Sequence, residues 1–171
     1  MCAREARPEM GIATELTVEN KNLYRRFLCR FDATAPDTPG AVERAGPAHF
    51  DAGAKVAVSH PVNEARGGVG YFTDIIAPIM AAFDGCTRRN EILLGGEYPG
   101  TEWVTSTGCF GGGFARPLFG IRPTGKRVFL REGDWWRRKD GKIIENGCML
   151  DIAHVLVQLG YDLFADLEAA A

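Results

Sequence analysis

The sequence predicts an α+β domain: a curved, mostly antiparallel sheet with helices over its concave face, which together form a cone-shaped pocket. Four strand-like segments follow one another between residues 88 and 151, and strands joined by short connections pair antiparallel. Segments with helical periodicity stand before and after this run, which is typical of helices gathered on one face of a sheet. Glycines inside the strand-like segments indicate bulges or bends that would curl the sheet.

The composition fits one domain, which we expect to span residues 17–171 after a flexible tail of residues 1–16 without periodicity. Hydrophobic residues make up 46% of the chain and the formal net charge is −2, which gives no general attraction to nucleic acid. The sequence has neither an apolar run long enough to span a membrane nor the apolar centre of a secretion signal. We therefore expect a cytoplasmic protein without nucleic-acid or membrane partners.

The cysteines and histidines predict neither a disulfide framework nor a metal site. The cysteine count is odd, no two cysteines form a C-x-x-C pair, and this usage fits a reducing compartment. The three histidines are too scattered along the chain for a convincing set of metal ligands: His49, His60 and His154.

The first elements are a helix and a short strand. Apolar residues at helical spacing predict an amphipathic helix over residues 17–32: Leu23, Phe27, Leu28 and Phe31. The Pro- and Gly-rich stretch after it reads as a loop with room for one short helix around 39–45. Residues 54–60 are rich in β-formers and predict a short strand, which Pro61 ends or kinks.

A second helix and the run of strands complete the domain. An apolar stripe that includes Phe72, Ile75 and Ile79 predicts a helix over 68–83, which Pro78 should kink or split. The predicted strands span residues 88–98, 102–112, 126–138 and 142–151, and a closing helix begins at Ile152.

The last two predicted strands form a hairpin whose register decides which side chains share a face. A three-residue loop, Lys139-Asp140-Gly141, predicts that Arg138 pairs with Lys142 and that Asp134 opposes Asn146. One face then carries Leu130, Glu132, Asp134, Trp136, Ile144, Asn146, Cys148 and Leu150. A two-residue turn would shift the partner strand by one and take Asn146 and Cys148 off the face of Asp134.

If this face is the concave one, it is mostly apolar with a few converging polar groups, as binding pockets are. Desolvation among apolar neighbours would raise the pKa of Asp134 and suit it to general acid/base chemistry. Alternatively, the face is solvated and Asp134 is an ordinary surface acid. The pattern alone does not separate these two interpretations.

The C-terminal third carries a family resemblance. The stretch "FGIRPTGKRVFLREGDWWRRKDGKIIENGCMLDIAHVLVQLG" resembles the SnoaL-like polyketide cyclases in its "PTGKRV", its "DGKI", and its Asp followed by a helix ending "QLG". The likeness spans residues 17–162 and implies the cone-shaped fold shared with nuclear transport factor two, steroid isomerases and limonene epoxide hydrolases. It also implies an intramolecular aldol closure catalysed by an Asp on the last strand and a His on the preceding one, without a metal or organic cofactor.

At both of these positions the chain departs from the family pattern. The "DGKI" match places the His position on Asp134 and the Asp position on Cys148. Asp134 can still act as an acid/base, whereas a thiol is poor at that task unless its pKa is lowered. The aldol mechanism therefore does not carry over intact, and the fold alone does not settle the function.

The leading hypothesis is a small cofactor-free enzyme, of cyclase or isomerase type, acting on a hydrophobic carbonyl-bearing or polycyclic substrate. The candidate catalytic residues are Asp134, Asn146 and His60, and the candidate substrate-binding residues are Tyr71, Leu130, Trp136, Cys148 and Leu150. One alternative is a non-catalytic binder of an apolar small molecule. The other is a structural or assembly protein with a vestigial pocket. In each case we expect a homodimer through the apolar outer face of the sheet, which carries Phe129, Trp135 and Met149.

Overall fold

The computed structural model of the protein describes residues 18–19, 21–22, 49–98 and 100–165. The predicted tail of residues 1–16 and the predicted short helix around 39–45 lie outside these residues. Of the predicted helix over 17–32, four residues are described, and they are helical: 18, 19, 21 and 22.

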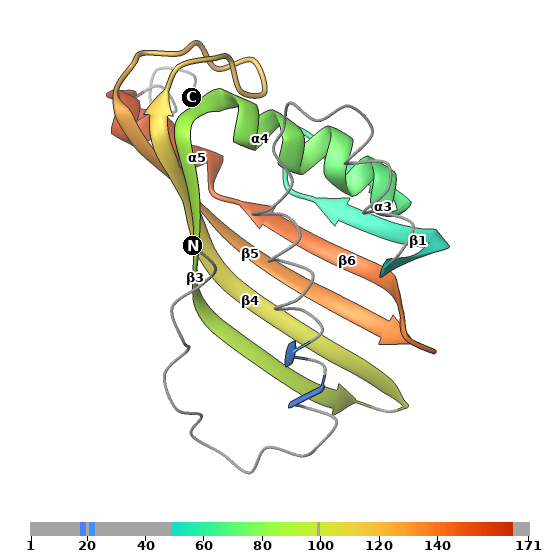
Figure 1. The fold of residues 1–171 in the computed structure, drawn as a ribbon. Helices are drawn as coiled ribbons and strands as arrows, with labels where there is room; N and C mark the ends of the chain where they lie inside the picture. Colours follow the sequence, from blue (N-terminus) through green and yellow to red (C-terminus); the bar gives the residue numbers. More distant parts are fainter. Residues whose placement is uncertain (1–17, 20, 23–48, 99, 166–171) are drawn as a thin grey trace.

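A sheet of six strands dominates the described part of the chain (Figure 1), in the order β2-β1-β6-β5-β4-β3. The strands are β1 (Phe50–Val58), β2 (Glu64–Arg66), β3 (Phe83–Tyr98), β4 (Thr101–Phe114), β5 (Arg127–Lys139) and β6 (Lys142–Leu150). Neighbouring strands are antiparallel except β1 and β6, which are parallel. The predicted α+β class with a mostly antiparallel sheet is confirmed. The three-residue β2 was not predicted, because so short a strand carries no alternation.

One continuous helix lies across the sheet, consisting of α3 (Gly67–Gly70), η1 (Tyr71–Ile76) and α4 (Ala77–Ala82). The predicted helix over 68–83 is thus confirmed to within one residue at each end. The middle six residues form a π-helix, in which the Ala77 N–H donates to the Phe72 carbonyl five residues back. This widened turn comes directly before Pro78, which has no N–H for the α-helical ladder. The helix therefore changes there from α-helical to π-helical hydrogen bonding and does not split.

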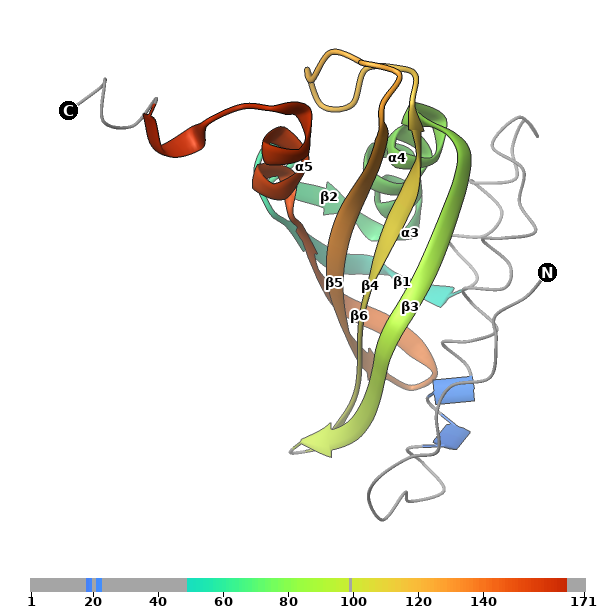
Figure 2. The same ribbon diagram turned by 90° about the vertical axis from the view of Figure 1, so that its left-hand side faces the viewer.

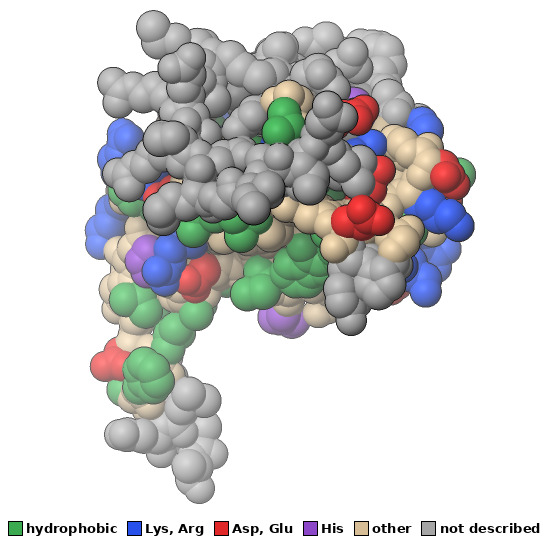
Figure 3. Space-filling model, turned by 90° about the horizontal axis from the view of Figure 1, so that it is seen from below, with side chains coloured by type: hydrophobic (Ala, Val, Ile, Leu, Met, Phe, Trp, Pro, Cys, Tyr) green, Lys and Arg blue, Asp and Glu red, His purple; other side chains and the backbone are tan. Residues whose placement is uncertain are grey.

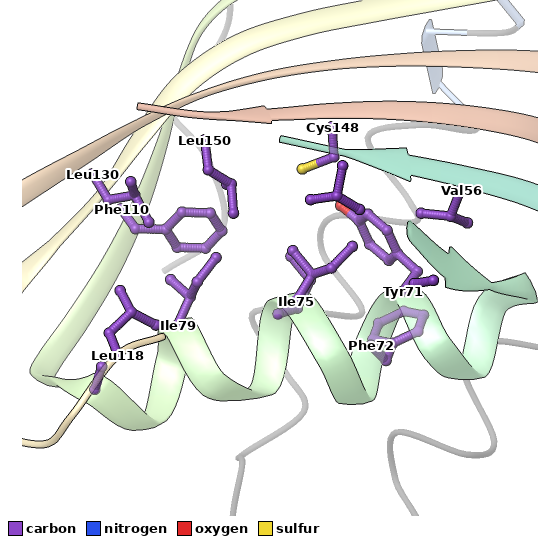
Figure 4. Close-up of a cluster of buried hydrophobic side chains, with 14 of the residues drawn as sticks. Val56, Tyr71, Phe72, Ile75, Ile79, Phe110, Leu118, Leu130, Cys148 and Leu150 are labelled. Atoms are coloured by element: carbon purple, nitrogen blue, oxygen red, sulfur yellow. The ribbon is translucent and has the colours of Figure 1, made fainter. Parts of the chain in front are cut away.

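The core lies between this helix and one face of the sheet. Figure 4 shows Tyr71, Ile75 and Ile79 pointing from the helix toward the strands. The facing side chains on the sheet are apolar and buried: Val56, Phe110, Leu130, Cys148 and Leu150. In β5 every second side chain from Val128 to Arg138 is buried. The face predicted to carry Asp134 is therefore the core face, whereas the cone-shaped pocket itself stays a prediction.

The turn of the β5–β6 hairpin differs from its prediction. Lys139 pairs with Lys142, so the loop has two residues, Asp140 and Gly141, with φ of 50° and 76°. Positive φ at both central positions is the conformation that a two-residue hairpin turn requires, and Asp-Gly is a favoured sequence for it. The predicted three-residue loop and the pairing of Arg138 with Lys142 are wrong.

A bulge beside the turn restores the predicted face. Arg138 pairs with Ile143 and Arg137 with Glu145, so that Ile144 is an extra residue. The two-residue turn shifts β6 by one residue relative to the prediction, and the extra residue in the bulge shifts it by one more. Two shifts of one residue together return the following residues of β6 to the face of Asp134. The pairs nevertheless differ from the prediction, since Asp134 opposes Cys148 and Trp136 opposes Asn146. Ile143, not Ile144, is buried.

The closing helix α5 (Ile152–Leu159) lies beside β5, past the end of β6. The side chain of Asp151 accepts a hydrogen bond from His154 N at its start, and Gly160 ends it with φ of 98°. The amide of Gln158 bonds both the N–H and the carbonyl of Phe129, as a neighbouring strand would. Residues 160–165 then leave the body of the molecule (Figure 2), and Figure 3 shows hydrophobic side chains on the projection at its lower left. Tyr161 and Phe164 in this segment are exposed.

The outer face of the sheet exposes the three large apolar side chains on which the dimer prediction rests: Phe129, Trp135 and Met149. Trp135 lies against Gly147, since a Cβ added to this glycine would meet the indole ring. The homodimer stays a prediction.

Candidate functional site

Three predicted site residues meet in the core, each from a different element. Asp134 lies on β5, Asn146 on β6 and Tyr71 on η1, and all three are 0% exposed. The Tyr71 hydroxyl donates to Asp134 Oδ2 at 3.2 Å, and Asn146 Nδ2 donates to Asp134 Oδ1 at 3.1 Å. Both carboxylate oxygens are thus held by donors. The interpretation of Asp134 as a solvated surface acid is wrong.

Two further charged residues, absent from the predicted set, complete the cluster. Arg88 on β3 donates from Nε and Nη2 to Glu132 Oε1 at 2.9 and 2.6 Å, and from Nη2 to Glu132 Oε2 at 2.8 Å. Its Nη2 also lies 3.3 Å from Asp134 Oδ2. Glu132 was expected on the same face but without a role. No local pattern points to Arg88, because it belongs to a strand that reaches β5 only across β4.

The surroundings of Asp134 raise its pKa to about 7. Burial is the largest cause, because it disfavours the charged carboxylate, and the negative charge of Glu132 adds to it. The guanidinium of Arg88 and the hydrogen bond from Asn146 lower this pKa but do not cancel the rise. Asp134 is therefore poised to take up or release a proton near neutral pH.

The two other titratable neighbours of Asp134 keep their protons. Burial, followed by the charge of Asp134, raises the pKa of the Tyr71 hydroxyl well above its usual value. The same two causes, in the same order, raise the pKa of the Cys148 thiol. Cys148 therefore has no thiolate to act as a base at the position where the resemblance implies an Asp.

The side-chain oxygen of Asn146 has no hydrogen-bond partner among the described residues. Asn146 Nδ2 donates to Asp134 Oδ1 and to the carbonyls of Trp135 and Gly147, which fixes the orientation of the amide. Its Oδ1 is buried and accepts no hydrogen bond from the described part of the chain. Buried acceptors are nearly always satisfied in folded proteins, so a bound molecule with a hydroxyl or N–H would complete this one.

The predicted substrate-binding residues surround the same cluster. Trp136 is 1% exposed and its ring meets that of Tyr71 at a centroid distance of 4.9 Å. The other three are also buried in this core: Leu130, Cys148 and Leu150.

His60 is the exception among the predicted site residues. β1 ends at Val58, opposite Cys148, and the chain then turns through residues 59–63 at the end of the strand. His60 is exposed in this turn. It is not among the side chains that hydrogen-bond to Asp134 in the described part of the chain, and its acid/base role stays a prediction.

The described residues hold no group of three or more His, Cys, Asp and Glu side chains arranged to bind a metal ion. None of the described helices has both the length and the apolar character needed to cross a bilayer.

The raised pKa of Asp134 predicts a pH-dependent loss of stability. Between the usual carboxyl value of 3.8 and about 7, the folded state keeps a proton that the unfolded state has lost. The free energy of unfolding should therefore fall as the pH rises through this window, by about 1.4 kcal/mol per pH unit, and level off above it. Asp134→Asn removes this contribution. Urea unfolding at about pH 5 and pH 6.5 should show a loss for the native chain about 2 kcal/mol larger than for the variant. Equal losses would contradict the buried, protonated carboxyl.

Solved structures with the same architecture include a SnoaL-like and an NTF2-like protein. The chain superimposes on AclR, a candidate hydroxylase from Streptomyces galilaeus, with a TM-score of 0.63 at 19% identity, covering 84% of this chain and 97% of AclR. A candidate SnoaL-like polyketide cyclase from Jannaschia sp. CCS1 gives a TM-score of 0.63 at 15% identity, covering 87% and 96%. An NTF2-like protein from Burkholderia thailandensis E264 gives 0.54 at 18% identity, covering 80% and 96%.

These likenesses confirm the fold that the resemblance implied. At such identities they establish the fold alone and leave chemistry and substrate open. No protein-family model matches the sequence, and comparison with curated proteins gives no match.

Proposed function

We propose that the protein is a small acid/base enzyme of cyclase or isomerase type that needs no cofactor and acts on a hydrophobic carbonyl-bearing or polycyclic compound. The observation that carries the proposal is the buried carboxyl of Asp134, with a pKa of about 7 and held by Tyr71 and Asn146. A carboxyl of this kind, in an apolar site with few polar groups, is the arrangement that general acid/base catalysis uses.

The reaction would begin with a proton transfer to Asp134. Its ionised form takes a proton from the carbon next to the substrate carbonyl, and the electrons of the C–H bond move to the carbonyl oxygen. Return of the proton to another carbon gives an isomer. Attack of the enolate carbon on a second carbonyl instead closes a ring, and the alkoxide that forms takes the proton back from Asp134 to give a hydroxyl. The neutral Tyr71 hydroxyl is the donor nearest to Asp134 Oδ2 and is suited to stabilise the enolate oxygen. The vacant Asn146 Oδ1 would accept from a substrate hydroxyl.

The shared first step can be tested without knowing the substrate. Fused-ring ketones such as α-tetralone are incubated with the protein in D₂O, and deuterium incorporation next to the carbonyl is followed by mass spectrometry. We expect incorporation well above the buffer rate, with a dependence on pH centred near 7. Saturable binding of the ketones with no exchange above buffer would instead support the non-catalytic binder.

A further inference from the structure

Among the described residues, Arg88 contacts two buried carboxyls, and its hydrogen bonds to them are unequal. Three of its contacts, at 2.6 to 2.9 Å, go to Glu132, and a single contact of 3.3 Å goes to Asp134. Short, forked hydrogen bonds between a guanidinium and a carboxylate are the strongest of this kind. The guanidinium of Arg88 therefore stabilises the negative charge of Glu132 more strongly than a negative charge on Asp134.

The unequal contacts of Arg88 affect the charge of Asp134 strongly because all three side chains are buried. The side chains of Arg88 and Glu132 are 6% and 0% exposed, so solvent screens neither charge. An ionised Asp134 would add a second negative charge to a pair that is already neutral. In the described part of the chain, the titratable groups that face Asp134 are Tyr71 from η1, Arg88 from β3, Glu132 on its own strand and Cys148 from β6. Tyr71 and Cys148 stay neutral, so neither supplies a positive charge to balance an ionised Asp134.

We propose that Arg88 and Glu132 are a positioning pair for Asp134: Glu132 holds the guanidinium fork, and the mobile proton of the site therefore resides on Asp134. This inference rests on the proposed function for its catalytic meaning, although the location of the proton can be tested without any activity. Neither residue needs to touch the substrate in order to act in this way.

Removing the charge of Glu132 should release Arg88 to Asp134. Glu132→Gln keeps the shape of the side chain but removes its negative charge, so the guanidinium would pair more closely with Asp134, the other carboxylate that it contacts among the described residues. Asp134 would then ionise more readily, because an opposite charge in contact favours the charged form. We expect its titration midpoint to fall by about one pH unit or more, which is a tenfold or greater loss of proton affinity.

The test is a ¹³C NMR titration of aspartate carboxyl carbons in the full chain. Asp134→Asn identifies the Asp134 resonance by its loss. Glu145→Gln is the matched control, because Glu145 forms a partly exposed pair with Arg137 on the same hairpin. We expect a midpoint near 7 in the native chain and in Glu145→Gln, and about 6 or lower in Glu132→Gln. Glu132→Leu, which is also neutral, should move it in the same direction and serves if Glu132→Gln does not fold.

An unchanged or raised Asp134 midpoint in the folded Glu132 variant would overturn the inference, whatever the enzyme activity. The pH profile of deuterium exchange is the second readout. If the NMR midpoint falls and the profile does not follow it, the positioning pair is correct and Asp134 is not the catalytic acid/base. If both move together, the pair and the proposed function are supported at once.

Discussion

Replacing Asp134 with asparagine is expected to slow deuterium exchange about 100-fold or more while leaving ketone binding nearly unchanged. Asparagine fills the same volume and keeps an oxygen at Oδ1 or Oδ2, but it cannot take up a proton. Because Asp134 is fully buried and its carboxyl is bonded by Tyr71 and Asn146, the variant changes the proton transfer more than the shape of the site. Exchange rates are compared at pH 7 with binding followed in parallel.

Asp140→Asn is the matched control for this loss. Asp140 lies on the same hairpin, is exposed, and has a positive φ that asparagine tolerates. Its exchange rate should equal that of the native chain. Full activity of Asp134→Asn would refute the proposed role. A weaker affinity with no change in rate would mean that Asp134 only anchors the ligand.

Replacing Arg88 with methionine is expected to lower the free energy of unfolding by about 3 to 5 kcal/mol at neutral pH. The substitution leaves Glu132 buried without its counter-charge, and it also removes the contact of the guanidinium with the Phe110 ring, at 5.1 Å from the ring centroid. Urea unfolding of the two chains measures the difference. Most of the loss reflects the stranded carboxylate, so Arg88→Met combined with Glu132→Gln should recover a large part of it.

The neighbouring Arg89 supplies the control. It forms its pair with Glu91 at the surface, where its side chain is 73% exposed. Exposed pairs contribute about 0 to 1 kcal/mol, so Arg89→Met should be almost neutral. Similar losses for Arg88→Met and Arg89→Met would show that the buried cluster is not held by Arg88.

Alternation in the strands predicted the core face well, because burial of one side imposes a period of two that is visible in any strand. Every second residue of β5 from Val128 to Arg138 is buried, as the sequence indicates. The hairpin register was wrong, because Lys139-Asp140-Gly141 is compatible with loops of two or three residues. Asn146 and Cys148 lie on the predicted face only because of the bulge at Ile144, and no feature of the sequence predicts this bulge.

Contacts between distant parts of the chain limited how much of the site could be predicted from the sequence. Arg88 and Glu132 are 44 positions apart, and nothing local distinguishes Arg88 from the exposed Arg89 beside it. Tyr71 was expected to line the site, but its hydrogen bond to Asp134 depends on how the helix crosses the sheet. His60 lies exposed in the turn after β1, and a histidine at a strand end does not predict the course of the turn that follows.

The parallel pairing of β1 with β6 has a consequence for how the chain reaches its fold. Ser59, just after β1, bonds Leu150 at the end of β6, 91 positions later. Strands β3 to β6 can pair in succession along the chain and β1 can pair with β2 at once, whereas the second edge of β1 must wait for the last strand. Such long-range closure is slow, because the entropy of the intervening chain is lost before the contact forms. On a ribosome, the edge of β1 that faces away from β2 would therefore stay unpaired until residues 142–150 have emerged, which makes it a segment for chaperones to protect.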